Sequence, residues 1–307
     1  MPTIARRRSL GSTSIAGFTL AVAAACAAPC AAQPQTQSQQ QTQPAANDAT
    51  ASTAASHDES RLTLRVEPVV WYAGYSGKLR MPGQSLGSSK TTVGELDGDS
   101  PRLTPSGSVL ISSDKWSFGL GGTAFSINDR SVQIGRAGEL GSISYAAGDT
   151  LTSSFDFNML EATVGYRLGR WELDDRAKSG IKLTPELHAF AGARMYDLEY
   201  DLARTQGGSL TLDRTFIEAI AGLRGSLRIA ERFSVDVTVD LGGMGGGNRS
   251  SFSWDVMAGF SWQPVDHLGI LVGYRNLAFD LESGDGTGKF RHDGAIAGLY
   301  FGLDLRF

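Results

Sequence analysis

Two pairs of side chains in this chain have the types that acid–base chemistry requires. Asp97 and Asp99 flank a single glycine, and His292 and Asp293 are adjacent near the end of the sequence. A carboxylate pair that faces a histidine–carboxylate pair could activate water for hydrolysis. An Asp-Gly-Asp sequence is also ordinary turn chemistry. The sequence therefore favours a non-enzymatic protein, and a hydrolase that uses these four residues is the alternative.

A second set of charged residues alternates with large apolar ones. Both signs are interleaved in this set, so we expect ion pairs in a shared interior, with Glu218 or Glu67 paired to an arginine such as Arg224 or Arg65. The network would form either a plug or the lining of a narrow channel. Its predicted members are Arg65, Glu67, Glu161, Arg167, His188, Arg194, Glu218, Arg224, Arg228, Asp236, Asp240, Asp255, Asp304 and Arg306.

Other site chemistries lack support in the sequence. The two cysteines, Cys26 and Cys30, fall in an N-terminal segment that we expect to be removed, so no thiol site is predicted. No ligand spacing indicates a metal, and no motif indicates a cofactor. The glycine run 242–247 lies between two predicted strands, so we expect a flexible loop there and not a phosphate cradle. The net charge is −4 and no basic patch occurs, which argues against nucleic acid as a partner.

The elements that would position these residues are segments of period-two alternation. A strand of period two has one apolar and one polar face, and a strand crossing a membrane needs roughly 9–11 residues. In the segment 268–281 the parity of the apolar residues changes, and a bulge near Arg275 is expected to reconcile the two halves. The predicted strands are 62–75, 103–112, 116–127, 160–168, 187–196, 215–229, 233–241, 251–262, 268–281 and 293–307.

The connections between these segments alternate in length. Those around 113–115, 230–232 and 263–267 are short, whereas 77–102 and 128–150 are long. Short and long connections alternate in this way in membrane barrels, whose strand number is even when both termini lie on the short-turn side. We therefore predict an all-β fold: a closed, antiparallel, transmembrane up-and-down β-barrel of about ten strands, with eight and twelve as alternatives. A secreted soluble lipocalin-like barrel or sandwich is the less favoured fold.

The N-terminal region has a different composition. Basic residues at 6–8 precede an alanine-rich uncharged run, and small residues before Gln33 suit a cleavage site, so residues 1–32 are predicted to be a signal peptide. Residues 33–60 are rich in Gln, Ala and Thr and are predicted to be a disordered periplasmic tether. The barrel would then occupy residues 61–307.

The C-terminal strand carries a family resemblance. Leu299, Phe301, Leu303, Leu305 and Phe307 alternate with smaller or polar residues and end on an aromatic ring. This pattern resembles the C-terminal signature of Gram-negative outer-membrane β-barrel proteins. The resemblance implies a place in the outer membrane with both termini in the periplasm. It also implies outer-membrane lipid and the barrel-assembly machinery as partners, with the five residues as the assembly signal.

Two further likenesses are narrower. The segment 66–77 resembles the first strand of small proteobacterial outer-membrane proteins of uncharacterised function. The Asp97–Asp99 and His292–Asp293 pairs faintly resemble the omptin proteases, which also have ten strands, although the loops do not correspond. The function expected from all of these features is structural, or that of a low-conductance channel for small solutes, and the alternative is a hydrolase acting at the extracellular rim.

Overall fold

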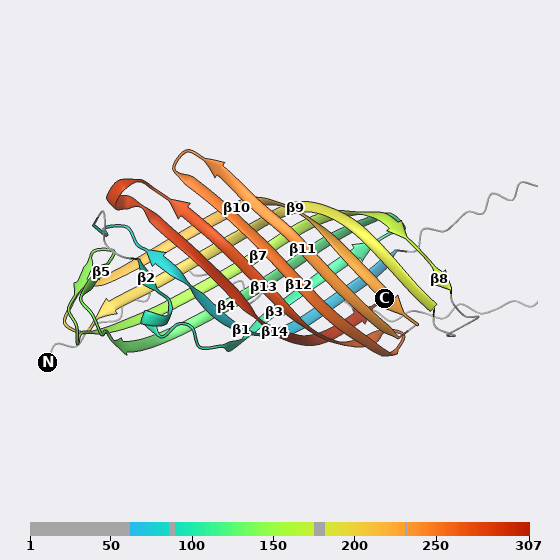
Figure 1. The fold of residues 1–307 in the computed structure, drawn as a ribbon, viewed down its shortest axis with the longest axis horizontal. Coiled ribbons are helices and arrows are strands. Elements are labelled where there is room, and N and C mark those ends of the chain that lie inside the picture. The colour runs from blue at the N-terminus through green and yellow to red at the C-terminus, as the bar shows by residue number, and fades with distance from the viewer. Residues whose placement is uncertain (1–61, 86–89, 175–181, 231) are drawn as a thin grey trace, which may run out of the picture. The chain divides into compact units, whose positions relative to one another are not determined.

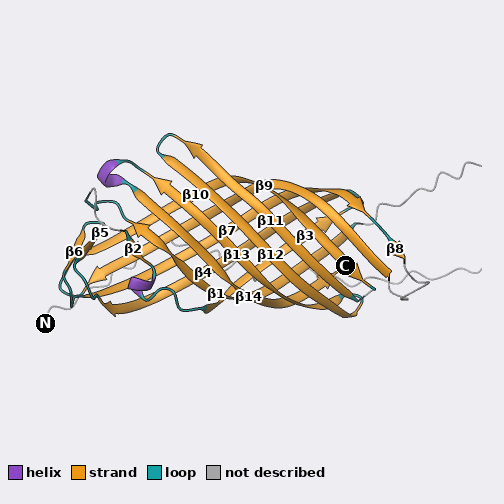
Figure 2. Ribbon diagram, in the orientation of Figure 1, coloured by secondary structure: helices purple, strands orange, loops and turns teal. Residues whose placement is uncertain are grey.

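The computed structural model describes residues 62–85, 90–174, 182–230 and 232–307. The predicted signal peptide and tether lie outside this range. Strands dominate the described residues (Figures 1 and 2), and no helix among them is long and apolar enough to cross a membrane. The ten long strands are β1 (Thr63–Arg80), β3 (Arg102–Ser112), β4 (Trp116–Gln133), β7 (Thr150–Arg170), β9 (Lys182–Arg204), β10 (Ser209–Ile229), β11 (Phe233–Gly246), β12 (Arg249–Val265), β13 (Leu268–Ser283) and β14 (Phe290–Arg306).

These ten strands form a closed antiparallel ring. Each pairs with its neighbour along the chain, and β14 pairs with β1 through a register that runs from Arg65–Arg306 to Arg80–Arg291. Beyond that register, the backbone N–H of Leu64 donates to the Phe307 carbonyl at 2.9 Å, and the N–H of Phe307 donates to the Leu64 carbonyl at 2.8 Å. Closure removes the free edge strands of an open sheet wherever neighbouring strands are paired. The predicted barrel of about ten strands is confirmed.

The two ends of the barrel differ. One end, the turn end, holds Leu62, Phe307 and the connections β3–β4, β7–β9, β10–β11 and β12–β13, with the short β8 (Leu173–Asp174). The other end, the loop end, holds the remaining connections, with short elements β2 (Thr91–Thr92), η1 (Gly94–Leu96), β5 (Gly138–Leu140), β6 (Ile143–Tyr145) and η2 (Gly286–Gly288).

Several strands extend further toward the loop end than the sequence analysis expected. The predicted long loops at 77–102 and 128–150 are shortened, because β1 runs to Arg80 and β4 runs to Gln133. The glycine run predicted as a flexible loop is also a strand as far as Gly246, since β11 remains paired with β12 up to the Gly246–Arg249 pair. The strands thus exceed the length that a bilayer requires.

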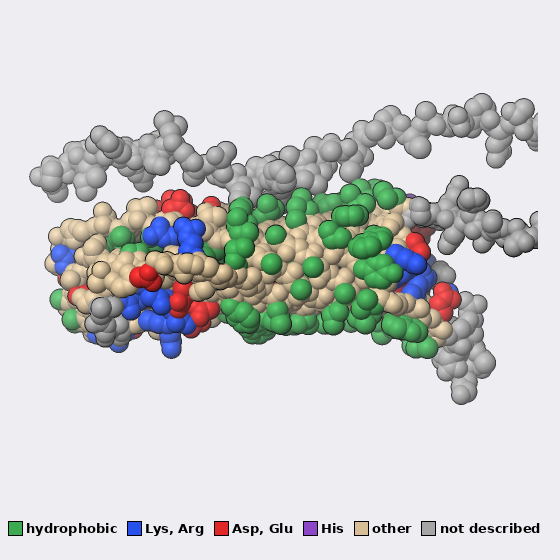
Figure 3. Space-filling model, turned by 90° about the horizontal axis from the view of Figure 1, so that it is seen from above, with side chains coloured by type: hydrophobic (Ala, Val, Ile, Leu, Met, Phe, Trp, Pro, Cys, Tyr) green, Lys and Arg blue, Asp and Glu red, His purple; other side chains and the backbone are tan. Residues whose placement is uncertain are grey.

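The outer face in the half near the turn end is apolar. Its exposed apolar side chains come from strands around the ring and are here called the lipid-facing belt, one face of which is seen in Figure 3. Aromatic rings gather at the border of the belt that is nearest the turn end, as in the aromatic girdles of membrane barrels. Among them is Trp116, which packs edge-on against Tyr166 with ring centroids 5.0 Å apart. The belt includes Val70, Tyr72, Leu120, Val164, Leu223, Val235, Val237, Val239, Leu241, Trp254, Phe260, Ile270, Val272, Tyr274, Leu299, Phe301 and Leu303.

The pattern reverses in the half near the loop end. There the outward positions of β7, β9 and β10 carry Asp156, Asp197, Glu199, Asp201 and Asp213, while aromatic and aliphatic residues point inward and are buried. A wall with so many outward carboxylates does not belong in lipid. The barrel is therefore a membrane barrel in one half and resembles a soluble barrel with an apolar core in the other.

This reversal explains the change of parity in β13, and the predicted bulge near Arg275 is wrong. The register through Arg275 is continuous, with Met257 on one side and Gly298 on the other. Tyr274 faces outward and Leu277 faces inward on a regular strand. The strand geometry of β13 is therefore regular throughout. What changes along it is the face that carries the apolar residues, which is the outer face near the turn end and the inner face near the loop end.

Candidate functional site

Arg194 lies at the centre of the lumen, and its side chain is fully buried. Its guanidinium is held from three strands: Nη2 lies 3.0 Å from an oxygen of Glu161 on β7, 3.0 Å from Asp240 on β11 and 3.6 Å from Asp255 on β12. A guanidinium can do this because it presents five donors in a fixed plane. One cation thus ties together strands on different sides of the lumen.

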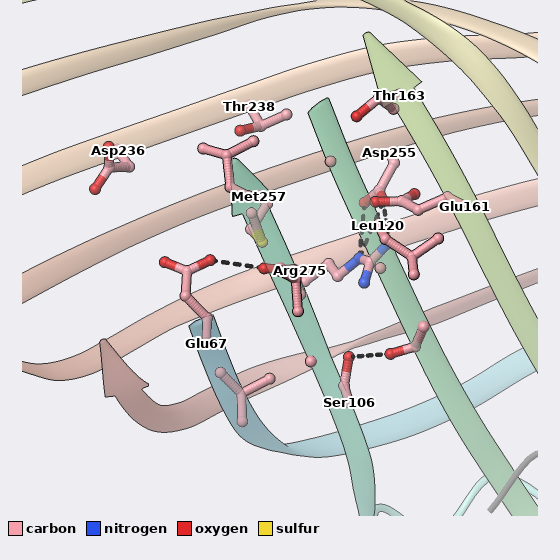
Figure 4. A pocket seen from close by; sticks show the side chains of 18 of the residues that line it. Glu67, Ser106, Leu120, Glu161, Thr163, Asp236, Thr238, Asp255, Met257 and Arg275 are labelled. Atoms are coloured by element: carbon pink, nitrogen blue, oxygen red, sulfur yellow. Dashed lines mark hydrogen bonds and ion pairs between the residues drawn. The ribbon is translucent and has the colours of Figure 1, made fainter. Parts of the chain in front are cut away.

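Two further residues complete this central cluster. Arg275 Nη2 lies 2.5 Å from Asp255 Oδ2, and the Arg275 guanidinium stacks over the Trp71 ring with its carbon 5.4 Å from the centroid. Glu218 Oε1 lies 3.8 Å from Arg194 Nη1 and accepts a hydrogen bond from the Tyr196 hydroxyl at 2.7 Å. Figure 4 shows Arg275, Asp255 and Glu161 pointing toward one another across the cavity.

The central cluster contains more acidic than basic groups. Glu161, Glu218, Asp240 and Asp255 are four carboxyl groups placed around two guanidinium groups, those of Arg194 and Arg275. Within the described residues, Glu218 Oε2 is buried with no hydrogen-bond partner. Buried charge is stable only when it is paired and hydrogen-bonded, so loss of either arginine would leave carboxylates uncompensated.

A second cluster lies nearer the turn end, around Arg65 and Asp304. Arg65 Nε donates to Asp304 Oδ1 at 2.9 Å, and Arg65 Nη2 lies 2.7 Å from Glu67 Oε1. Arg306 Nη2 adds a contact of 2.6 Å to Asp304, and Asp236 on β11 lies 3.7 Å from Arg65. This second cluster bridges the lumen from β1 to β11.

A cavity of about 110 Å³ lies between the two clusters. Glu67, Asp236, Thr238 and Arg275 line it (Figure 4), and on β4 the inward positions beside it are Gly119 and Gly121. A Cβ at Gly121 would lie 3.0 Å from Glu161 Oε1, and one at Gly119 would lie 2.5 Å from Thr163 Oγ1. The two glycines therefore make room for the side chains that reach across from β7. A polar cavity of this size is suited to a few water molecules.

Between the central cluster and the loop end, the lumen is filled by aromatic rings, here called the aromatic plug. Phe157 stacks on Phe279 with centroids 5.4 Å apart, and Phe155 stacks on both Tyr75 at 4.8 Å and Tyr200 at 4.5 Å. Ring pairs at these separations are attractive beyond the area that they bury. The plug consists of Tyr75, Phe125, Phe155, Phe157, Tyr196, Tyr200, Phe279, Phe290 and His292, all of them buried.

His292 is the polar centre of this plug and is fully buried. Its Nδ1 is hydrogen-bonded to the Tyr200 hydroxyl at 2.7 Å, and its Nε2 is hydrogen-bonded to the Tyr75 hydroxyl. A neutral imidazole donates from one nitrogen and accepts at the other, so it satisfies both tyrosines. The position is beyond the lipid-facing belt, because the outward neighbours Asp293 and Lys78 face each other across β14 and β1. Burial lowers the pKa of His292 to about 3.

The four residues of the predicted hydrolase site lie in different surroundings. Asp293 points outward from β14, on the opposite face from His292. Asp97 follows η1, with Oδ2 3.8 Å from Arg130 Nη1, and Asp99 is exposed. Among the described residues, no hydrogen bond or ion pair joins the aspartate pair to His292 or Asp293. Both ring nitrogens of His292 are therefore hydrogen-bonded to tyrosines, and no carboxylate among the described residues is hydrogen-bonded to it.

The remaining predicted lumen residues lie mostly toward the turn end. Arg224 stacks over Phe190 at 5.8 Å and does not pair with Glu218. Arg167 forms an ion pair with Asp114 of the β3–β4 turn, and Arg228 is exposed. His188 lies 3.5 Å from Glu186. Within the described part of the chain, no group of three or more His, Cys, Asp or Glu side chains is placed to hold a metal ion.

The sequence analysis missed Arg275, Ser253, Tyr196 and the aromatic plug as parts of the lumen. Arg275 was treated only as the position of a bulge, and Ser253 donates a hydrogen bond to Glu218. A signal for the plug existed, since Phe155 and Phe157 alternate on the same face as Glu161 and opposite Ala162 and Val164. The plug therefore appears as apolar residues on the face that carries charges further along the same strand.

The chain was compared with known proteins. No family model matches it, and no curated protein is similar to it in sequence. Among solved structures it is similar to the outer membrane protease OmpT of Escherichia coli, with 12% identity over 80% of this chain and 97% of that chain and a TM-score of 0.43. It is also similar to the Neisserial surface protein NspA, with 12% identity over 80% of this chain and 97% of that chain and a TM-score of 0.30. A third similar structure is the Pseudomonas putida toluene transporter TodX, with 12% identity over 81% of this chain and 90% of that chain and a TM-score of 0.27.

These likenesses concern only the general architecture, and no activity carries over from them. The closed ring, the lipid-facing belt and the aromatic girdle define an outer-membrane β-barrel.

Proposed function

We propose that this chain is a non-enzymatic structural barrel of the outer membrane whose lumen is closed to solutes. The observation that supports this most directly is the aromatic plug, in which rings from opposite walls are in contact. The central charge cluster adds a second barrier below it. A pore large enough for small solutes needs a lumen free of such contacts.

We further propose that the turn end faces the periplasm and the loop end faces the exterior. Short turns on the periplasmic side and longer connections outside are the usual arrangement in bacterial barrels. The half that projects beyond the belt has a packed apolar core, so it would stand outside the membrane as a rigid extension. Small solutes arriving from the exterior would then reach the cavity only if the plug opened.

The test is conductance in a planar bilayer, using protein purified from outer membranes. We expect the wild-type protein to insert without stable current. A Phe157→Ala/Phe279→Ala double variant removes two facing rings and is expected to give discrete current steps. The matched control is Phe118→Ala/Phe252→Ala, which removes two rings from the outer face.

Stable discrete steps from the wild-type protein would overturn the closed barrel and favour the low-conductance channel for small solutes. Insertion without current in both wild type and double variant would support closure by the charge cluster as well as the plug. No contact in the described residues favours the hydrolase alternative, since His292 lacks a carboxylate partner.

A further inference from the structure

The barrel wall separates at two places near the loop end. Pairing between β3 and β4 stops at Ser106–Thr123, although β4 continues to Gln133. Pairing between β10 and β11 stops at Ala219–Gly243, although β10 continues to Ser209. Neighbouring strands in a closed barrel normally stay paired, so each separation leaves backbone groups that other residues, water or a ligand must satisfy.

The chain itself fills the first separation. The segment 91–98 lies there, with Val93 and Leu96 buried, and the Leu96 carbonyl accepts a hydrogen bond from Ser153 Oγ at 3.3 Å. Arg102 reaches across to the Ser126 carbonyl at 2.9 Å. These contacts close the wall between β3 and β4 with apolar packing and hydrogen bonds.

The second separation is not filled by any described residue. Residues 209–218 of β10 pair with β9 alone, and the end of β11 pairs with β12 alone. Figure 1 shows the β11–β12 hairpin diverging from β9 and β10. A groove of about 510 Å³ lies between them, lined by residues 215–217, 244–246 and 249–251. This volume is in the range of small-molecule sites, which is about 300–1,000 Å³.

The groove lies at the upper border of the lipid-facing belt, where upper means nearer the loop end. Ile217 and Phe252 point outward beside it with about half of their surface exposed (55% and 54%), and Met244 is 55% exposed. Below Ile217 the wall continues with Ala219, Ala221 and Leu223, so the groove is continuous with the surface that meets lipid. Above it, Thr215 and Arg249 are polar.

The inner wall of the groove contains an unsatisfied polar group. Ser251 is 8% exposed, and its Oγ is buried with no hydrogen-bond partner among the described residues. A buried hydroxyl without a partner costs free energy unless a ligand supplies one. Phe216 lies beside it in the lining and packs against Phe290 at 6.2 Å, which connects the groove to the aromatic plug.

We propose that this groove binds one acyl chain of a phospholipid that enters sideways from the bilayer. The chain would lie against Ile217, Met244 and Phe216, and the Ser251 hydroxyl would donate to the ester carbonyl at the top of the chain. Arg249 at the rim would lie near the phosphate. The free backbone edge of β10 also suits an added peptide strand. The exposed apolar side chains and the continuity with the belt favour lipid.

The experiment uses the full chain in phosphatidylethanolamine vesicles that contain one phospholipid with a diazirine on an acyl chain. After irradiation, mass spectrometry locates the adducts. We expect enrichment on Met244, Phe216 and Ser251 over belt residues such as Val237 and Val239. Gly245→Trp should abolish this enrichment by filling the groove, since a Cβ at Gly245 meets no atom within 4 Å.

Gly225→Trp is the matched control, because a Cβ there also meets no atom within 4 Å and Gly225 lies on the lower half of β10. This variant should keep the groove adducts. Equal labelling of groove and belt in the wild-type protein would overturn the proposal, whether or not either variant assembles. Protection of the amides of residues 209–217 by an added valine–threonine peptide, without lipid adducts in the groove, would instead assign the edge to a peptide.

Discussion

The rings of Phe157 and Phe279 stack with their centroids 5.4 Å apart, although four strands separate β7 from β13 in either direction around the barrel. Tyr200 on β9 and His292 on β14 are likewise on opposite walls and are hydrogen-bonded at 2.7 Å. The lumen at this level is therefore no wider than the side chains that fill it. Ring packing here stabilises the fold as a core does.

Truncation of a plug ring should be costly. We expect Phe279→Ala to lower the free energy of unfolding by about 3–5 kcal/mol, because it leaves a cavity between packed rings. Phe252→Ala, which removes a ring from the outer face, should cost much less. Urea titration of both variants in the same vesicles measures the difference. Equal losses would mean that a plug ring contributes no more to stability than a ring on the outer face.

Arg194 should be less tolerant of substitution than arginines at the turn end. Arg194→Met removes the cation shared by several buried carboxylates and should destabilise the barrel by roughly 3–5 kcal/mol. Arg170→Met, whose partners Glu172 and Glu186 are 3.5 and 3.6 Å away on an accessible rim, should cost about 1 kcal/mol or less. Thermal unfolding of the two variants checks the ranking. Similar melting temperatures would contradict it.

The plug should weaken in acid. The pKa of His292 is about 3 in the folded state, whereas an unfolded histidine titrates near 6.5. The unfolded chain therefore binds a proton that the folded chain excludes, so stability falls as the pH drops below about 6.5 and continues to fall toward pH 3. Between pH 7 and pH 5 this histidine contributes a loss of about 2 kcal/mol.

Urea titrations at pH 7 and pH 5 measure that loss. His292→Asn cannot take up the proton, so its stability should change less over the same interval. A wild-type protein and a variant with equal pH dependence would show that another group is responsible.

The last residue should matter for assembly. Phe307 pairs with Leu64 through two backbone hydrogen bonds and packs its ring parallel to His267 at 6.4 Å. We expect Phe307→Ala to reduce the fraction of the chain that reaches the membrane as a compact barrel, since the predicted assembly signal loses its terminal ring. Gel mobility of unheated samples reports that fraction. Phe118→Ala, another exposed ring at the turn end, is the control, and equal reduction would contradict a specific role for Phe307.

Orientation in the membrane can be tested with protease sites. A site inserted in the Gly247–Asn248 hairpin should be cut on intact cells if the loop end is outside. A site in the 113–115 turn should be cut only after the outer membrane is opened. The reverse pattern would invert the proposed orientation.

The sequence was sufficient for the fold and, in the half near the turn end, for the face of each strand on which the apolar residues lie. Strict alternation in 233–241 and 299–307 placed apolar residues outward, and the structure has the same arrangement on β11 and β14. It could not specify which charges pair, because pairing depends on stagger between strands. Arg194 reaches Asp240 two strands away, a contact that no spacing along the chain indicates.

The aromatic plug was not predicted, because its residues follow the same period-two alternation as the barrel wall but on the opposite face of each strand. On β7, buried apolar residues occupy odd positions as far as Met159, and exposed ones occupy even positions from Ala162 onward. On β13, Tyr274 is exposed and Leu277 is buried. Read singly, each change of parity suggests a defect in one strand. Only when the strands are aligned around the ring do the changes fall at a common depth and mark a boundary.

That boundary also fixes where the molecule sits in the bilayer. Sliding the barrel inward would bring Lys78 and Arg291 toward hydrocarbon, at about 2–4 kcal/mol for each such cation that reaches the midplane. Sliding it outward would expose Tyr72 and Leu299 to water, at about 25 cal/mol for each Å² of apolar surface. Both displacements are opposed, so the residues of the wall themselves hold the barrel at one depth in the bilayer.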